Sequence, residues 1–337
     1  MTAVNRCWCL ALLLSGLCAL PALADETLPG VSIIWDTDMD TDCDDVGALA
    51  MLHALADAGE AKILATVVSS HYPYSAPCVE AINRYHGRGD LPIGAPKQPG
   101  APIDRGSRYA RAIAERYDTT LATNDDADDA VDVYRRVLAA APDRSVVVVT
   151  VGYVTNLRYL LKSKPDQHSD LDGRLLVQQK VARWVCMGGR YPEHLDPRVY
   201  GNFKPDPPAI VEAAANWPTT IYFSGMGAEV GTGRTRNQLP ADHPLRVAYD
   251  LYLGDKPTRP SWDQAATLFA VRPNAPYWKL RQTGSNHIFE NGTNRWVDEP
   301  DLARHVLVEY AADPGEVIQQ LTQTIESLMT RPPAGKR

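Results

Sequence analysis

The sequence predicts a single α/β domain with a Rossmann-like core, in which a mainly parallel central sheet is flanked by helices. Short apolar, β-branched segments alternate with helical patterns, which is the rhythm of βαβ units. The segment from Ser145 to Val151 shows no polar alternation, as expected of a strand that helices cover on both faces. The chain has 337 residues, of which 45% are hydrophobic, and no break in composition demands a second domain.

The individual elements follow from the spacing of apolar residues and from residues that start or end helices. The predicted strands are 31–37, 62–69, 91–94, 145–151, 181–187 and 219–224, with short strands around Trp278 to Trp296. The predicted helices are 45–58, 77–85, 107–117, 128–141, 207–215, 243–253, 262–270 and 314–329. Pro207 and Pro208 are placed to open one of these helices, and Asp313 is placed to cap the last.

The first 24 residues have the pattern of an export signal, which makes 25–337 the mature domain. Arg6 precedes an apolar stretch from Leu10 to Leu20, and Ala22-Leu23-Ala24 resembles a cleavage site. The stretch is too short to span a bilayer. We therefore expect a periplasmic or secreted protein that leaves the membrane once the signal is removed.

The charge balance argues against nucleic acid and anionic membranes as partners. Loss of Arg6 takes the net charge from -7 to about -8, and no run of Lys or Arg occurs.

Cys43, Cys78 and Cys186 remain after signal removal. Cys43 and Cys78 are candidates for a disulfide because both follow early strands, whereas Cys186 lies in an apolar segment and is expected to be a buried thiol. The sequence allows, without requiring, a homo-oligomer.

An acidic run is the most informative segment of the chain. Six aspartates lie within the ten residues from 36 to 45, between a buried strand and an apolar helix: Asp36, Asp38, Asp40, Asp42, Asp44 and Asp45. Such runs are usually solvated, but ligands of open α/β sheets bind at this position. Clustered carboxylates repel one another unless a cation neutralises them, and oxygen donors suit calcium or magnesium rather than zinc.

The six positions are not equivalent. Asp36 and Asp38 are two residues apart, so on a strand they point to one face. Asp44 and Asp45 start a helix, whose dipole favours carboxylates. Asp40 and Asp42 lie between these pairs and can simply face water.

The acidic run resembles D-x-D-P-G-x-D-D, the calcium-site signature of nucleoside hydrolases of the inosine-uridine type. Other segments extend this resemblance over most of the mature chain, in the order that the family shows. They are Ala65–Val68, Val151–Leu157, Met187–Gly189, Asn202–Pro207 and Asp263. The chain is therefore similar to a divergent, exported nucleoside hydrolase.

The resemblance implies calcium-dependent hydrolysis of the N-glycosidic bond of a ribonucleoside, as in purine salvage. It implies calcium ligation by the carboxylates of Asp38, Asp45 and Asp263 and by the backbone carbonyl of Val151. Asp38 would also act as the general base on a water molecule. Asp44 would act in catalysis by holding ribose hydroxyls, together with Asn202 as a further substrate contact.

Several residues depart from the family pattern. The acidic loop is two residues longer, and Met39-Asp40 replaces Pro-Gly. Ser69-Ser70 replaces Gly-Asn, which makes Ser70 and His71 candidate replacements for a substrate contact. Tyr200 replaces a glutamate, which changes the expected recognition of the ribose 5′-hydroxyl.

Trp262 stands where inosine-uridine enzymes have a histidine that protonates the leaving base. Tryptophan cannot protonate a leaving group, but it can stack on one, and in this respect the chain resembles purine-preferring members of the family. Trp262 is thus a catalytic candidate and favours purine over pyrimidine nucleosides. The alternative that it is a large core aromatic stays open.

Other functions remain alternatives. The chain can be a non-catalytic, calcium-dependent binder of nucleosides or sugars, or a hydrolase of a different N-riboside. A phosphohydrolase with a D-x-D-x-T motif is disfavoured, because Asp40 occupies the threonine position.

Overall fold

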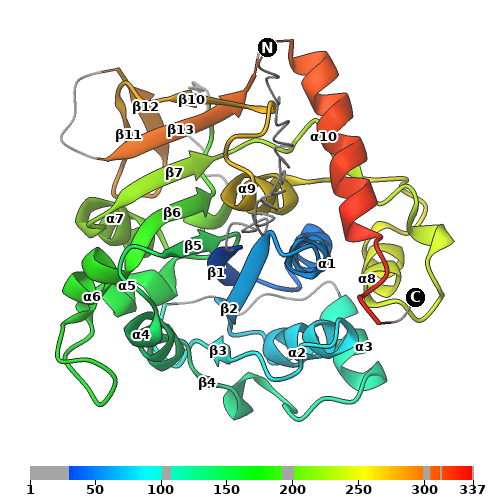
Figure 1. Cartoon of the computed structure of the whole chain (residues 1–337), viewed down its shortest axis with the longest axis horizontal. Helices are drawn as coiled ribbons and strands as arrows, with labels where there is room; N and C mark the ends of the chain where they lie inside the picture. The colour runs from blue at the N-terminus through cyan, green and yellow to red at the C-terminus, as the bar shows by residue number, and fades with distance from the viewer. Residues whose placement is uncertain (1–29, 101–107, 192–200, 299–303, 312, 336–337) are drawn as a thin grey trace, which may run out of the picture.

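The computed structural model describes residues 30–100, 108–191, 201–298, 304–311 and 313–335. Its centre is a nine-stranded sheet with the order β10-β13-β7-β6-β5-β1-β2-β3-β4 (Figure 1). Neighbouring strands of this sheet are parallel except at one edge, where β10 runs antiparallel to β13. The expected α/β class with a mainly parallel sheet is confirmed.

The strands of the central sheet are β1 Val31–Thr37, β2 Ala61–Val68, β3 Ile93–Ala95, β4 Asp128–Asp129, β5 Val146–Thr150, β6 Val181–Met187, β7 Thr220–Ser224, β10 Trp278–Arg281 and β13 His305–Tyr310. Two antiparallel ribbons accompany it: β8 Gly231–Thr232 with β9 Arg259–Pro260, and β11 Ser285–Ile288 with β12 Asn294–Val297.

The helices are α1 Asp44–Asp57, α2 Ser75–Tyr85, α3 Tyr109–Arg116, α4 Ala130–Ala140, α5 Thr155–Lys162, α6 Gly173–Lys180, α7 Pro207–Asn216, α8 Pro244–Leu253, α9 Trp262–Val271 and α10 Pro314–Met329. Short 3-10 turns cover Asn124–Asp126, Gly201–Phe203 and Arg236–Gln238.

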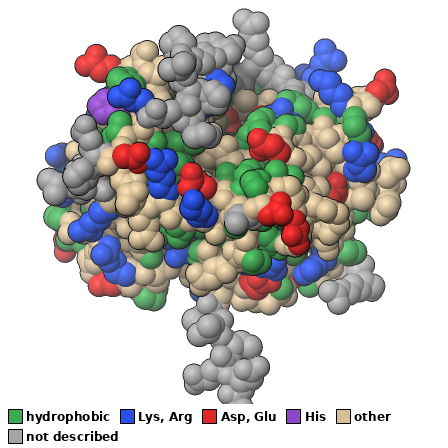
Figure 2. All heavy atoms as spheres, turned by 90° about the horizontal axis from the view of Figure 1, so that it is seen from above, with side chains coloured by type: hydrophobic (Ala, Val, Ile, Leu, Met, Phe, Trp, Pro, Cys, Tyr) green, Lys and Arg blue, Asp and Glu red, His purple; other side chains and the backbone are tan. Residues whose placement is uncertain are grey.

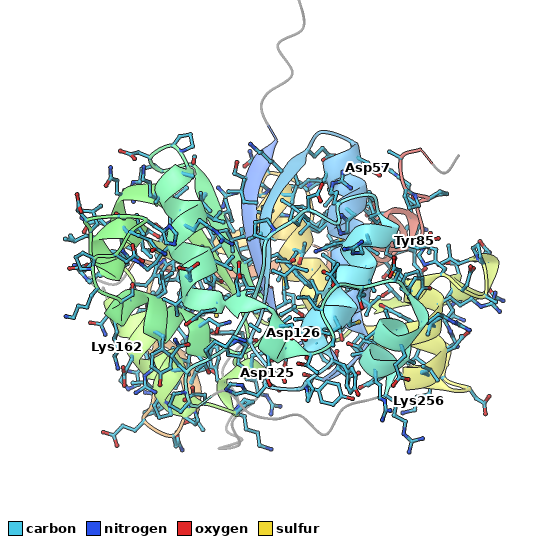
Figure 3. The ribbon with its side chains drawn as sticks, turned by 90° about the horizontal axis from the view of Figure 1, so that it is seen from below. Asp57, Tyr85, Asp125, Asp126, Lys162 and Lys256 are labelled. Atoms are coloured by element: carbon cyan, nitrogen blue, oxygen red, sulfur yellow. The ribbon has the colours of Figure 1, made fainter. Side chains whose placement is uncertain are left out.

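The sheet separates two apolar cores. Successive residues of a strand point to opposite faces, so Ile33 and Trp35 of β1 join one core and Ile34 the other. Residues of α1, α2, α3, α8, α9 and α10 fill the first core, and residues of α4 to α7 fill the second. In the view from below, Lys162 of α5 and Lys256 beyond α8 lie on opposite sides of the molecule (Figure 3).

The order in which successive strands join the sheet reverses at β1. From β1 the sheet extends one way through β2, β3 and β4, and the other way through β5, β6 and β7. In open parallel sheets a crevice forms at the carboxyl ends of the two strands where this reversal occurs. The ends of β1 and β5 therefore mark the expected ligand position.

Several sequence-based expectations differ from the structure. Helices α5 and α6 and strand β13 were not predicted. Asp313 precedes α10 but has a left-handed backbone with φ of 59° and makes no capping hydrogen bond through its side chain, so its predicted capping role is wrong. Cys43 and Cys78 are free thiols, so the candidate disulfide does not form, whereas the expected burial of Cys186 is confirmed.

The predicted export signal, residues 1–24, lies outside the described residues. Within the ranges that the structure describes, none of the helices combines the length and apolar character that crossing a membrane requires. On the face shown in Figure 2, basic and acidic side chains are interspersed rather than gathered into a patch of one sign.

Candidate active site

Asp36 supports the site from the end of β1. Its side chain is fully buried, and its Oδ2 accepts hydrogen bonds from the Tyr134 hydroxyl at 2.9 Å and from Asn156 Nδ2 at 3.1 Å. Burial raises the pKa of Asp36 to about 7. Asp36 thus ties β1 to α4 and α5, the two helices that supply its partners.

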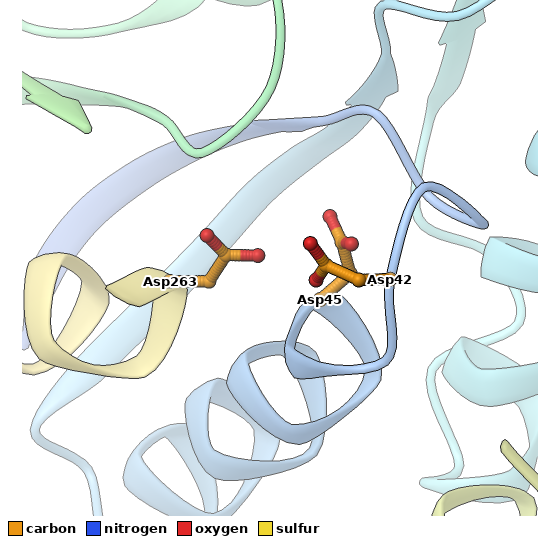
Figure 4. Close-up of side chains that lie close together, drawn as sticks. All are labelled: Asp42, Asp45 and Asp263. Atoms are coloured by element: carbon orange, nitrogen blue, oxygen red, sulfur yellow. The ribbon is translucent and has the colours of Figure 1, made fainter. Parts of the chain in front are cut away.

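Three carboxylates gather beyond the end of β1. One oxygen from each of Asp42, Asp45 and Asp263 lies within 4.8 Å of the others, and Figure 4 shows the three groups turned toward one another. Asp42 belongs to the acidic loop, whereas Asp45 and Asp263 lie in the first turns of α1 and α9. A purely oxygen donor set of this charge fits a hard divalent cation.

The electrostatics of this cluster explain why a cation would stabilise it. Burial raises the pKa of Asp45 and of Asp263 well above the usual value, and the neighbouring carboxylates raise both pKa values further. Thr37 Oγ1 donates a hydrogen bond to Asp45. Two helix N-termini also point at the cluster, but their positive ends offset only part of its negative charge.

Asp40 does not face water, whereas the Asp42 side chain is 23% exposed. Asp40 has a backbone φ of 97° and a buried carboxylate that accepts a hydrogen bond from the Ala110 backbone N–H at 2.9 Å. Its own backbone N–H donates to the Tyr109 hydroxyl at 2.6 Å. These contacts fasten the longer loop to α3. Asp42 is turned toward the carboxylate cluster.

Asp38 is buried beside the three-carboxylate cluster but is not one of its members. Its negative charge contributes to the raised pKa values of Asp45 and Asp263. Its backbone carbonyl accepts a hydrogen bond from Thr41 Oγ1 at 2.7 Å. The roles of Asp38 as calcium ligand and general base stay predictions.

Val151 follows β5 and meets the predicted ribose contact Asn202. The Val151 carbonyl accepts a hydrogen bond from Asn202 Nδ2 at 2.6 Å. The next residue, Gly152, has no room for a side chain, because an added Cβ would lie 2.2 Å from the Asp38 backbone nitrogen and 2.4 Å from Ser69 Oγ. The carboxyl ends of β1, β2 and β5 are therefore in direct contact around Gly152.

A cleft of about 570 Å³ opens beside the cluster. Asp42 connects the cleft to the cluster, and Asn202 and Trp262 also line it. Trp262 is the first residue of α9 and is partly exposed, so it lies at the cleft wall rather than within the core. The remaining lining residues are Met187–Tyr191, Gly201, Gly225, Ala228, Glu229 and Arg259.

Arg259 is a residue of the site that sequence reasoning missed. Its Nε donates to Asp44 Oδ1 at 3.1 Å, and its Nη2 donates to Asp42. Its guanidinium carbon lies 4.9 Å from the ring centre of Trp262 and 5.3 Å from that of Tyr252. The only sequence signal was a cation four residues before Asp263, which does not reveal contact with the distant acidic loop.

No family model and no curated protein matches the sequence. Solved structures do match its fold. A plant nucleoside hydrolase is 16% identical with a TM-score of 0.65, covering 90% of this chain and 100% of that one. This chain has the nucleoside hydrolase fold. The inosine-uridine preferring nucleoside hydrolase from Bacillus anthracis is 15% identical with a TM-score of 0.64, covering 88% of this chain and 99% of that one. A purine-preferring ribonucleoside hydrolase from Gardnerella vaginalis is 15% identical with a TM-score of 0.63, covering 89% and 99%.

Within this nucleoside hydrolase fold, the polar side chains of Ser70 and His71 each contact a backbone group. Ser70 is fully buried and its hydroxyl accepts a hydrogen bond from the Tyr72 backbone N–H at 3.1 Å. His71 Nε2 lies 3.1 Å from the Gln98 carbonyl oxygen. Neither is among the described residues that line the cleft. Tyr200 lies outside the described residues.

Proposed function

We propose that this chain is a calcium-dependent N-ribohydrolase that releases base and ribose from a ribonucleoside. The observation that carries the proposal is the cluster of Asp42, Asp45 and Asp263, which connects through Asp42 to a cleft of about 570 Å³. That volume is typical of pockets for small organic ligands. The nucleoside hydrolase fold supports the same reaction, and a small-molecule nucleoside is the substrate that we propose.

Calcium is the metal that we propose for the cluster, because all its donors are oxygens and the pKa values of Asp45 and Asp263 are raised. Asp45 and Asp263 would hold it, together with Asp42, Asp38 or the Val151 carbonyl. The chemistry that calcium would supply there is to make the attacking water more acidic. Asp38 would take the proton from that water, and Asp44 and Asn202 would hold the ribose hydroxyls.

A preference for purine nucleosides is supported by Trp262, whose partly exposed side chain lines the cleft. A purine offers an aromatic side chain a larger stacking surface than a pyrimidine does. One of the similar solved structures is a purine-preferring ribonucleoside hydrolase. We further propose that the protein is exported, on the strength of the apolar stretch that follows Arg6. Purine salvage is the role that we propose for the release of a purine base.

The experiment is a base-release assay on a panel of purine and pyrimidine nucleosides, with calcium and with a chelator. We expect release from purine nucleosides that the chelator abolishes. Asp38→Asn should lower kcat by roughly a hundredfold or more, since it removes the general base. Asp125→Asn changes an exposed aspartate that is not among the residues lining the cleft, and it should leave release unchanged. Release that survives both metal removal from the protein and Asp38→Asn would contradict the mechanism.

A calcium-dependent nucleoside binder is the second candidate function. It is favoured by Trp262, because this side chain cannot supply a proton to a departing base. Isothermal titration with a purine nucleoside separates the two candidates. Binding that requires calcium, with no base released over hours, would favour the binder.

A further inference from the structure

Arg259 holds a fixed position on the wall of the cleft. Two carboxylates, Asp42 and Asp44, accept its hydrogen bonds, and the rings of Tyr252 and Trp262 lie against its guanidinium. The side chain is 18% exposed and is among the residues that line the cleft. A guanidinium held by four neighbours needs little reorganisation when a ligand arrives.

One edge of this guanidinium is left for a ligand. The group carries five N–H donors in a planar fork. Nε and Nη2 donate to the two carboxylates, which occupy one edge. Nη1 has no hydrogen-bond acceptor among the described residues, so it and the second hydrogen of Nη2 form a pair of parallel donors. These two donors are the part of the side chain that a ligand in the cleft can use.

We propose that Arg259 binds the departing nucleobase through this edge and selects 6-oxopurines over adenine. The inference rests on the proposed hydrolysis of an N-riboside. Two parallel donors of an arginine match the O6 and N7 acceptors of guanine and hypoxanthine. Adenine presents an amino donor at the 6-position instead, which would face the guanidinium donors.

The same contact supplies the stabilisation that Trp262 cannot. As the bond between C1′ and the base nitrogen breaks, its electron pair passes to the base. The water oxygen forms the new bond to C1′, and one water proton passes to the Asp38 carboxylate. The base leaves as an anion and takes a proton from solvent. Arg259 would donate hydrogen bonds to the charge that develops on O6 and N7, without giving up a proton itself.

The first test compares substrates that differ in the leaving group. Inosine and adenosine differ at the 6-position, and 4-nitrophenyl riboside has a leaving group that is stable as an anion. Arg259→Gln and Arg259→Lys should each lower kcat/KM for inosine by at least about tenfold. Hydrolysis of adenosine and of 4-nitrophenyl riboside should fall far less. Arg174→Gln, an exposed arginine on α6, is the matched control.

An equal loss on all three substrates would overturn the inference, because it would mean that Arg259 only holds Asp42 and Asp44 in place. Arg259→Lys keeps a positive charge beside these carboxylates, so it guards against a failure of Arg259→Gln to fold. Circular dichroism of each variant checks the fold.

A binding measurement tests the inference even if the protein hydrolyses nothing. Quenching of tryptophan fluorescence reports a base that reaches Trp262. The wild-type protein should bind hypoxanthine at least about tenfold more tightly than Arg259→Gln does, whereas the affinity for adenine should be the same in both. Equal hypoxanthine affinity in the two proteins, or no binding of hypoxanthine by the wild type, would overturn the inference. Absence of hydrolysis with the expected binding difference would instead count against the proposed function alone.

Discussion

His53 is a buried histidine of α1 whose surroundings keep it neutral. Its ring lies 4.6 Å from that of His86 in a stacked arrangement, and its Nε2 is 2.9 Å from Asn83 Oδ1. Burial, followed by the positive charge of Arg88, lowers the pKa of His53 from 6.5 to about 3. A histidine with a depressed pKa stabilises the fold above its unfolded pKa and loses that contribution as the pH falls.

His53→Gln should therefore weaken the dependence of the unfolding free energy on pH. In the wild type, the contribution of His53 is fully present above pH 6.5 and is lost as the pH falls toward about 3. Urea unfolding between pH 4 and 7 measures the slope of the unfolding free energy against pH, which reports how many more protons the unfolded state binds than the folded state. This number of protons should decrease by up to about one in the variant. Exposed His287→Gln is the control. An unchanged slope in His53→Gln would show that His53 is not the acid-sensitive group.

At the same scale, the sequence identified part of the site and missed part of it. Asp45 and Asp263 were identified because each lies at the start of an apolar helix, in its first turn, within a recognised motif. Asp42 was not, because an alternating acidic loop does not reveal which carboxylates turn inward. That choice depends on the left-handed backbone of Asp40 and on its contacts with α3. Arg259 was missed because its partners are more than 200 residues away.

At the scale of elements, the site depends on how closely α1 approaches α9. Gly47 lies in α1 at this approach, and a Cβ there would be 2.5 Å from Gln264 Nε2 and 2.5 Å from the Tyr249 hydroxyl. Gln264 Nε2 also donates a hydrogen bond to that hydroxyl at 2.9 Å. The two helices carry Asp45 and Asp263, so their separation sets the distance between these carboxylates.

Gly47→Ala should lower the free energy of unfolding by about 1–3 kcal/mol, because the methyl group forces the packed side chains apart. Gly315→Ala in α10 is a matched control, since its Cβ would meet only Asp313 Oδ1 at 3.8 Å. The control should be neutral or stabilising by up to about 1 kcal/mol. Chemical denaturation compares the two. A similar effect of both substitutions would show that the contact at Gly47 relaxes freely.

The elements themselves were predictable where the pattern was long or strongly apolar. The bounds of β1 and β6 agree with the predicted strands 31–37 and 181–187. Helices α5 and α6 have eight residues each, so they are too short for a helical spacing of apolar residues to be recognised in the sequence. Strand β13 is a short apolar run whose place beside β7 depends on tertiary pairing.

At the scale of the whole molecule, the cluster joins distant parts of the chain. Asp42 and Asp45 follow the first strand, Asp263 lies in the first turn of α9, and the sheet brings them together. An unfolded chain cannot hold these oxygens in one place. A metal that binds the cluster should therefore stabilise the folded state over the unfolded state.

Calcium should raise the Tm of the wild-type protein, and a chelator should reverse the rise. At a free calcium concentration a hundredfold above Kd, the stabilisation is about 2.7 kcal/mol. Asp263→Asn should remove most of the shift, whereas Asp125→Asn should keep it. Differential scanning fluorimetry measures each Tm. A calcium-induced shift that persists in Asp263→Asn would place the metal elsewhere.

The three cysteines within the described residues are free thiols, and they can be used to follow how the molecule opens. Cys43 lies in the acidic loop, Cys78 in α2 and Cys186 in β6, and all three are buried. Burial raises the pKa of each thiol, to about 12 for Cys186. Because the thiolate is the form that reacts, alkylating reagents modify these cysteines only after the structure around them opens. The chain thus carries its own reporters of local unfolding. Alkylation of Cys43 ahead of Cys186 would mean that the acidic loop opens while the sheet stays closed.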